Sequence, residues 1–204
     1  MSSALVRSPR LAILIGGWSL IAATVLFAAV FTYLAGAFGY PDVLDLPAGA
    51  VLPRLLALGE AGRAVWVVYG LTPLLLIPVA VGVHAATRDA APRLAHVATI
   101  TAVLSAIAMA VGLLRWPSLQ WQLALAWVDG SVASREVIQA VFNAANSYLG
   151  NYIGEFLGEL FLNAFFLAAS FALARAAGAP RRWVRYAGAI AALVGALAML
   201  RNVT

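Results

Sequence analysis

Long apolar runs constrain this sequence more than any other feature. The first run covers residues 11–38 and ends at the turn signals Gly39, Tyr40 and Pro41. A helix needs about 20 apolar residues to cross a bilayer, and lipid offers no hydrogen-bond partner to an irregular backbone. The runs also lack the alternating pattern of barrel strands. The sequence therefore predicts transmembrane helices and an all-α fold.

A bundle of five spans is expected from these runs. They lie at roughly residues 11–38, 64–86, 94–115, 150–175 and 184–200. The first exceeds the apolar core of a signal peptide, which is about 7–15 residues, so we expect it to remain as a helix. Charged residues make up 10% of the chain, against about 25% in soluble domains. We therefore predict one integral membrane domain over residues 1–204, with five or six spans.

The arginines indicate the orientation of the chain. With a cytoplasmic N-terminus, eight of them lie inside in short segments and five lie outside. The inner group is Arg7, Arg10, Arg88, Arg93, Arg175, Arg181, Arg182 and Arg185, and the outer group is Arg54, Arg63, Arg115, Arg135 and Arg201. Positive charge concentrates in cytoplasmic loops. We expect a multi-pass protein of the cell membrane with its N-terminus inside, and no nucleic-acid partner, since these charges orient helices.

Two long outer segments, 39–63 and 116–149, separate the spans. The first contains the amphipathic stretch VLPRLLALGEAG. The second begins WPSLQWQLALAWVDGS, whose apolar part is too short to span. A surface-lying or re-entrant helix is expected there, with Trp116, Trp121 and Trp127 at headgroup depth. The rest of the second segment is predicted to run as a helix into the fourth span, so that one long helix projects outward.

The entrance to the fourth span, YLGNYIGEFLGELFLN, carries the most distinctive pattern. Its polar residues recur at steps of four: Asn151, Glu155, Glu159 and Asn163. Glycines recur beside them at the same step: Gly150, Gly154 and Gly158. That glycine spacing lets a neighbouring helix approach closely. We therefore predict that the glycines pack helices and that the polar stripe faces protein or a water-filled cavity.

The two glutamates are expected to need a partner. Counted from Arg175 at about 1.5 Å per residue, Glu159 lies about 24 Å and Glu155 about 30 Å into the membrane. A charge at such depth is costly, so each carboxylate should be protonated, paired or hydrated. Arg115 ends the third span on the same side, and we predict that it pairs with Glu155 or Glu159. The alternative is that its guanidinium reaches the lipid headgroups.

Other chemistry has little support in the sequence. There is no cysteine, no ExxH or HExxH pair and no GxSxG motif, which disfavours thiolate, di-iron, zinc-protease and serine-hydrolase sites. His84 and His96 lie near the inner ends of their spans and form at most a weak metal pair; interfacial histidines are the plainer interpretation. We expect no metal and no cofactor.

Three segments resemble a known family. They are GYPDVL after the first span, GLLRWP at the end of the third and NSYLGNYIGEFLG entering the fourth. Together they are similar to bacterial integral membrane proteins of the domain-of-unknown-function four-three-eight-six family. The resemblance covers Arg115, Trp116 and Pro117, and also Gly154, Glu155, Leu157 and Gly158. It implies a helical membrane fold of five or six spans without an established activity, and Glu159 lies outside its pattern.

Three functions remain open from the sequence. In the first, a small or lipid-like ligand or a proton binds in an outward-facing polar pocket lined by Arg115, Asn146, Asn151, Glu155, Glu159 and Asn163. In the second, the glycine face docks a partner helix or a second copy of the chain. In the third, which we favour least, a glutamate acts as general acid or base in an intramembrane enzyme. The bilayer itself is the one partner common to all three.

Overall fold

The part of the chain that the structure describes is helical throughout. The computed structural model describes residues 9–177 and 182–199. Its α-helices are α1 (Pro9–Phe38), α2 (Ala48–Ala57), α3 (Gly59–Leu71), α4 (Leu76–Thr87), α5 (Pro92–Leu114), α6 (Trp121–Val128), α7 (Val132–Ala145), α8 (Gly158–Ala177) and α9 (Arg182–Met199). Two 3₁₀ turns, η1 (Asp42–Asp45) and η2 (Thr72–Leu75), and two π-helical segments, η3 (Trp116–Gln120) and η4 (Asn146–Leu157), connect them. The predicted all-α bundle is confirmed.

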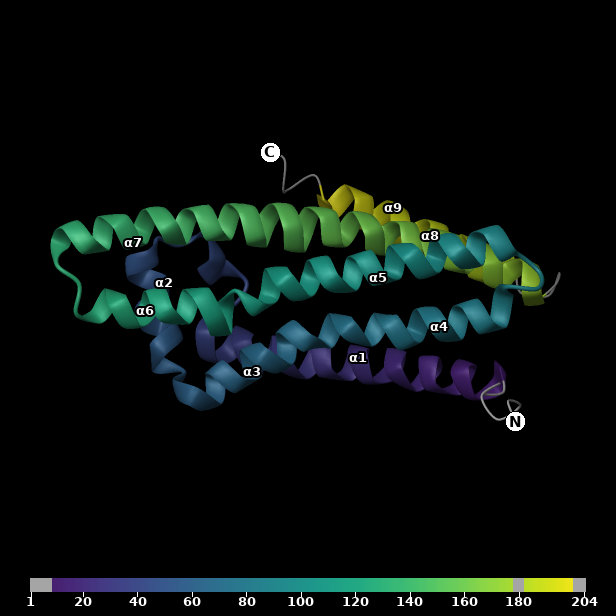
Figure 1. The fold of residues 1–204 in the computed structure, drawn as a ribbon, viewed down its shortest axis with the longest axis horizontal. Coiled ribbons are helices and arrows are strands. Elements are labelled where there is room, and N and C mark those ends of the chain that lie inside the picture. The colour runs from purple at the N-terminus through teal and green to yellow at the C-terminus, as the bar shows by residue number, and fades with distance from the viewer. Residues whose placement is uncertain (1–8, 178–181, 200–204) are drawn as a thin grey trace, which may run out of the picture.

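Four continuous helices are long and apolar enough to cross a membrane, as the sequence predicted for its first four runs. They are Pro9–Phe38, Gly59–Thr87, Pro92–Val128 and Val132–Ala176, with 30, 29, 37 and 45 residues. They run roughly antiparallel to one another, with the N-terminal end of α1 near the α4–α5 turn (Figure 1). This is the architecture of a multi-pass membrane protein. The 3₁₀ turn η2 lies at Thr72 and Pro73, because proline cannot donate the next helical hydrogen bond.

The fifth predicted span corresponds to α9, which packs along α8. With 18 residues it is about 27 Å long, close to the thickness of a hydrocarbon core. Small residues bring the two helices together, since Gly188 lies against Ser170 and Gly195 against Asn163. Whether α9 completes a fifth crossing stays a prediction. Arg7, Arg181 and Arg201, which contributed to the predicted orientation, lie outside the described residues.

The two longest helices extend well beyond the others and carry a second compact region. We call this region the cap; it comprises η1, α2, η3, α6 and α7 with the adjoining ends of α1 and α3. Helix α2 packs against both α6 and α7 (Figure 1). The core of the cap contains large side chains, among them Phe38, Trp66, Trp116, Trp121 and Phe142. The predicted continuation of the second outer segment as a helix into the fourth span is confirmed, because α7, η4 and α8 are continuous; that the helix projects to the outer side stays a prediction.

The expectation of a surface-lying or re-entrant helix at residues 116–127 is wrong. Helix α6 instead continues α5 through the π-turn η3. Pro117 is tolerated there because it occupies the first turn, where its missing N–H leaves no bond unmade. Trp116 and Trp121 are 1% and 4% exposed, so their rings pack inside the cap instead of facing lipid headgroups. The apolar stretch of α6 is short because helix α2, instead of lipid, covers it.

Candidate functional site

The candidate residues gather where α5 ends beneath the cap. At this point the helix widens into η3, where the Gln120 N–H donates to the Arg115 carbonyl at 2.8 Å. On the opposite helix α7 widens into η4. A hydrogen bond from Gln120 to Asn146 joins the two π segments. π-Helical segments are rare overall, and those that occur are frequently found at functional sites. The contact between two of them makes this junction a candidate functional site.

Arg115 is buried at the junction, with 7% of its surface exposed. Its Nε donates to Asn146 Oδ1 at 3.1 Å, and its Nη1 donates to the Gly112 carbonyl. Its guanidinium also lies 5.1 Å from the centroid of the Trp116 ring. Gly150 makes room for this group, because a Cβ there would lie 2.5 Å from Nη2. The glycine in η4 is therefore what lets the guanidinium approach the opposing helix closely.

Asn146 connects the buried charge to the surface of the cap. Its Oδ1 accepts a second hydrogen bond, from Gln120 Nε2 at 2.8 Å, and Gln120 is fully buried. One carbonyl oxygen thus uses both lone pairs on two buried donors. Asn146 itself is half-buried, and it also lines an open pocket.

That pocket has a volume of about 400 Å³ and lies between η1 and the α7–η4 helix. It is lined by Leu44, Asp45, Leu46, Pro47, Gln139, Phe142, Asn143, Asn146, Ser147 and Asn151. Counted from Arg175, Asn151 lies about 36 Å and Gln139 about 54 Å along the helix. Both values exceed the thickness of a hydrocarbon core, about 30 Å. The pocket therefore lies farther from Arg175 than one hydrocarbon thickness.

Glu155 belongs to a buried polar cluster below the pocket. The carboxylate is half-buried and interacts electrostatically with Arg115 and with Tyr69 of α3. The side chains of Tyr69 and Tyr40 are joined by a hydrogen bond. The expected partnership of Arg115 and Glu155 thus has an electrostatic basis, while their direct contact stays a prediction. Glu159 lies half-buried one turn deeper.

The predicted pocket and the observed one overlap only in part. Asn146 and Asn151 line it, whereas Arg115 lies beneath Asn146 and the two glutamates lie deeper in the bundle. Asn163 faces α9, with its Nδ2 3.4 Å from Met199 Sδ. Asn163 points away from the pocket because side chains four residues apart on an α-helix are rotated by about 40° about the helix axis. In η4 the wider π turn reverses that rotation, but α8 beyond it does not.

The three glycines of the stripe lie against α5 of the same chain. A Cβ at Gly154 would lie 2.8 Å from Gly112 Cα, and one at Gly158 would lie 2.7 Å from Met109 Cγ. Beside this contact, Ser105 Oγ donates to the Gly158 carbonyl at 2.9 Å. Close approach of two backbones is what small residues allow between membrane helices.

Comparison with known proteins connects this arrangement to a family. The family model described as a domain of unknown function, DUF4386, matches residues 4–204. The chain belongs to the DUF4386 family. No curated protein and no solved structure matches it. Because the match covers nearly the whole chain, the DUF4386 unit includes both the spans and the cap.

The three segments that resemble DUF4386 members include Arg115 and Glu155, and both belong to the cluster of polar residues at the junction of η3 and η4. The residues that sequence reasoning missed are Gln139, Asn143 and Ser147. A signal for them existed, because they continue the four-residue step backward from Asn151. The Gln139 Nε2 also donates to Asn143 Oδ1 at 2.8 Å, one step along this ladder.

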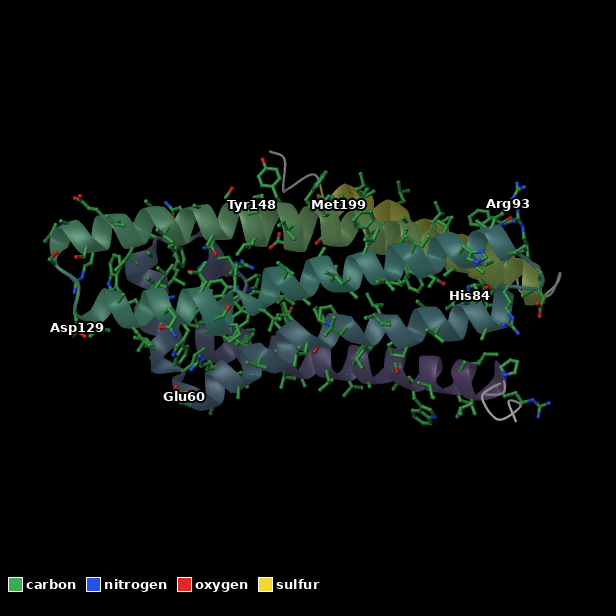
Figure 2. All side chains as sticks on the ribbon, viewed as in Figure 1. Glu60, His84, Arg93, Asp129, Tyr148 and Met199 are labelled. Atoms are coloured by element: carbon green, nitrogen blue, oxygen red, sulfur yellow. The ribbon has the colours of Figure 1, made fainter. Side chains whose placement is uncertain are left out.

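His84 lies at the opposite end of this DUF4386 chain from the cap (Figure 2), and His96 lies beside it. The rings of His84 and His96 are 5.1 Å apart, and His84 Nδ1 lies 3.4 Å from Thr99 Oγ1. Within residues 9–177 and 182–199, no group of three histidine, aspartate or glutamate side chains could hold a metal ion. The pair therefore plays no part in the junction cluster.

Proposed function

We propose that this DUF4386 protein binds a small, water-soluble, cationic ligand in the polar pocket of its cap. The lining offers amides and a hydroxyl at regular steps, Gln139, Asn143, Ser147 and Asn151, together with the carboxylate of Asp45. Amides both donate and accept hydrogen bonds, and a carboxylate only accepts. A ligand with an ammonium group and further polar groups complements this set.

The observation that carries the proposal is the double role of Asn146. It lines the pocket and at the same time holds Arg115 and Gln120 through one oxygen. A buried charge is tolerated only when its hydrogen bonds are made. A ligand that draws on Asn146 therefore competes with Arg115 for the same acceptor, and occupancy of the pocket is coupled to the charge cluster at the base of the cap.

The proposed setting is the cell membrane, with the N-terminus cytoplasmic and the cap outside. Arginines near the inner end are Arg10, Arg88, Arg93, Arg175 and Arg185, while Figure 2 places Arg93 at that end and Asp129 and Glu60 at the cap. The cap side also holds most of the acidic residues: Asp42, Asp45, Glu60, Asp129 and Glu136. This asymmetry supports the orientation through the positive-inside rule.

The other two functions have less support from the structure. A partner helix could not dock on the glycine face, because α5 of the same chain already covers that face. An enzyme using a glutamate requires substrate access to it, and the residues that line the open pocket do not include Glu155 or Glu159.

Native mass spectrometry of the protein released from lipid nanodiscs tests the proposed function. The wild type should carry a small bound mass. The double variant Asn143→Leu/Asn151→Leu, which removes two of the four polar side chains spaced four residues apart in the lining, should lose it. Asp45→Asn should weaken its retention. The matched control is Gln122→Leu, an exposed amide of α6 outside the pocket.

Two outcomes would refute the proposal. One is a wild type without any bound small molecule. The other is a bound mass that the ladder variants retain as well as the control does. If Glu155→Gln/Glu159→Gln alone abolished retention, the ligand would sit among the carboxylates of the bundle rather than in the cap.

A further inference from the structure

We infer a second binding site, a groove between α3 and the α5–η3 junction that holds the headgroup of one phosphatidylethanolamine molecule. The groove has a volume of about 570 Å³ and is separate from the polar pocket. It is lined by Glu60, Arg63, Ala64, Val67, Leu114, Pro117 and Ser118. One end is polar and the other is apolar, which is the pattern of an amphipathic ligand.

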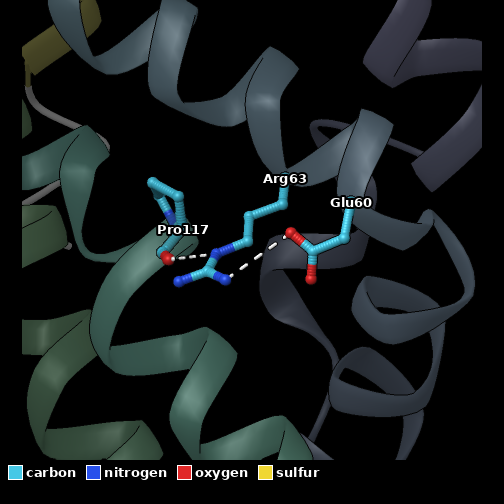
Figure 3. A network of polar contacts seen from close by, with 3 residues as sticks. All are labelled: Glu60, Arg63 and Pro117. Carbon is cyan, nitrogen blue, oxygen red and sulfur yellow. Dashed lines mark hydrogen bonds and ion pairs between the residues drawn. The ribbon is translucent and has the colours of Figure 1, made fainter.

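The polar end is built around Arg63. Its Nε donates to the Pro117 carbonyl at 3.0 Å, and its Nη1 lies 3.6 Å from Glu60 Oε2 (Figure 3). The guanidinium also lies 5.1 Å from the centroid of the Trp121 ring. The contacts with Pro117 and Trp121 fix its position, and a guanidinium has five N–H donors in all. A fixed guanidinium is well suited to bind two phosphate oxygens side by side.

The depth of the groove matches the boundary between hydrocarbon and headgroups. Counted from Arg88 along the α3–α4 helix, Val67 lies about 32 Å and Arg63 about 38 Å from the inner end. Counted from Arg93 along α5, Leu114 lies about 32 Å and Ser118 about 38 Å from the same end. Both helices thus place the apolar lining at the edge of a core about 30 Å thick and the polar lining one turn beyond it.

The charges of the groove select one class of headgroup. Arg63 and Glu60 form a loose pair whose side chains are 35% and 79% exposed. Exposed pairs of this kind contribute little to stability, so a headgroup can separate them. A phosphate then takes Arg63 and a primary ammonium takes Glu60. A glycerol headgroup leaves Glu60 facing a phosphate without compensation, and a choline headgroup has no N–H to donate.

The test uses the full-length protein, freed of lipid in detergent and titrated with defined lipids of identical acyl chains. Native mass spectrometry counts the bound phosphatidylethanolamine, phosphatidylglycerol and phosphatidylcholine. Phosphatidylethanolamine should bind first in the wild type. Arg63→Gln should weaken its binding at least about tenfold, because one charge-assisted hydrogen bond alone contributes about that factor. Glu60→Gln should leave binding in place but remove the preference over phosphatidylglycerol.

The controls are Arg54→Gln and Glu136→Gln, exposed charges of the cap outside the groove. If Arg63→Gln does not fold, Val67→Trp, which fills the apolar end, should weaken phosphatidylethanolamine binding in its place. Equal binding of the three lipids by the wild type would overturn the inference. The inference would also be overturned if the preference for phosphatidylethanolamine survived in the Glu60→Gln variant and, in addition, in the Arg63→Gln variant or, where that does not fold, in Val67→Trp. None of these results depends on the ligand of the cap pocket.

Discussion

The cap and the membrane-level bundle are held together by different kinds of residue. In the cap, the rings of Phe38, Trp66 and Trp116 pack on one another with centroids 5.0–5.7 Å apart. In the bundle, the buried cluster between α4, α5 and α8 is mostly alanine, with Ala98 and Ala102 fully buried. The same chain therefore uses large aromatic side chains in one region and the smallest ones in the other.

The difference follows from the two solvents. In water, burying a large apolar side chain is itself favourable, so the cap gains stability from the area of its aromatic residues. In lipid, the surrounding chains are as apolar as the helices, and little is gained by burial alone. There the helices gain from close backbone approach, as at Gly112 and Gly154 or at Gly16 and Gly82. Mutations should therefore act by different mechanisms in the two regions.

Trp116→Ala should have the largest effect on stability. The indole is 1% exposed and lies against Trp66, Phe38 and Phe142. Truncating a buried tryptophan costs about 3–5 kcal/mol. Steric trapping in bicelles measures this free energy of unfolding. Trp18→Ala, at a lipid-facing side chain that is 68% exposed, is the control and should be almost neutral. Similar losses for both variants would contradict the aromatic core of the cap.

Asn146→Leu tests the border between the two regions. The change removes the acceptor shared by Arg115 Nε and Gln120 Nε2 and leaves two buried donors without it. Each orphaned donor costs about 1–3 kcal/mol, and because the Arg115 guanidinium keeps its hydrogen bond to the Gly112 carbonyl we expect the lower part of the summed range, a loss of about 2–4 kcal/mol. Chemical denaturation of the purified protein measures it. The exposed Asn143→Leu, which touches neither donor, should cost much less; equal costs would show that Asn146 does not hold the junction.

Gly154→Leu should disturb the bundle without reaching the cap core. The new side chain would collide with the α5 backbone at Gly112, and overpacking of this kind costs about 1–3 kcal/mol. The melting temperature in detergent reports it. Gly36→Leu is a matched control, because no atom outside its own helix lies within 4 Å of a Cβ at that glycine. A melting temperature that fell equally in both variants would contradict the packing account, and helix propensity could not explain it, because leucine favours a helix more than glycine does.

The contrast between the regions also explains which features the sequence could predict. Apolar runs and glycine spacing are local, and they located four long helices and the face of η4 that meets α5. The cap depends on contacts between distant segments. Nothing near Trp121 in the sequence indicates that α2, about 70 residues earlier, covers it. The tryptophans of α6 therefore suggested an interface with lipid although they form the interior of a folded region.

The site was predicted only in part, because some of its residues are placed by contacts between distant segments. The four-residue step identified Asn151 and Glu155, and the same step extended backward would have added Asn143. The rotation of Asn163 toward α9 was not predictable, because it depends on where a π segment ends. Asp45 reaches the pocket from η1, and only the tertiary fold brings that turn beside α7.

Ser105→Ala should have the smallest effect of the four, and it sharpens the account of the bundle. The buried hydroxyl donates across the helix interface to the Gly158 carbonyl, and hydrogen bonds between membrane helices contribute about 0.6 kcal/mol on average and up to about 1.7. Ser170 is a close match: it is also buried, but its hydroxyl bonds to Leu167 within its own helix. Steric trapping should show a loss of about 0.6–1.7 kcal/mol for Ser105→Ala and a smaller one for Ser170→Ala. If the two losses are equal, the hydroxyl at Ser105 adds nothing to the association of α5 with α8, and the glycine contacts alone hold these helices together.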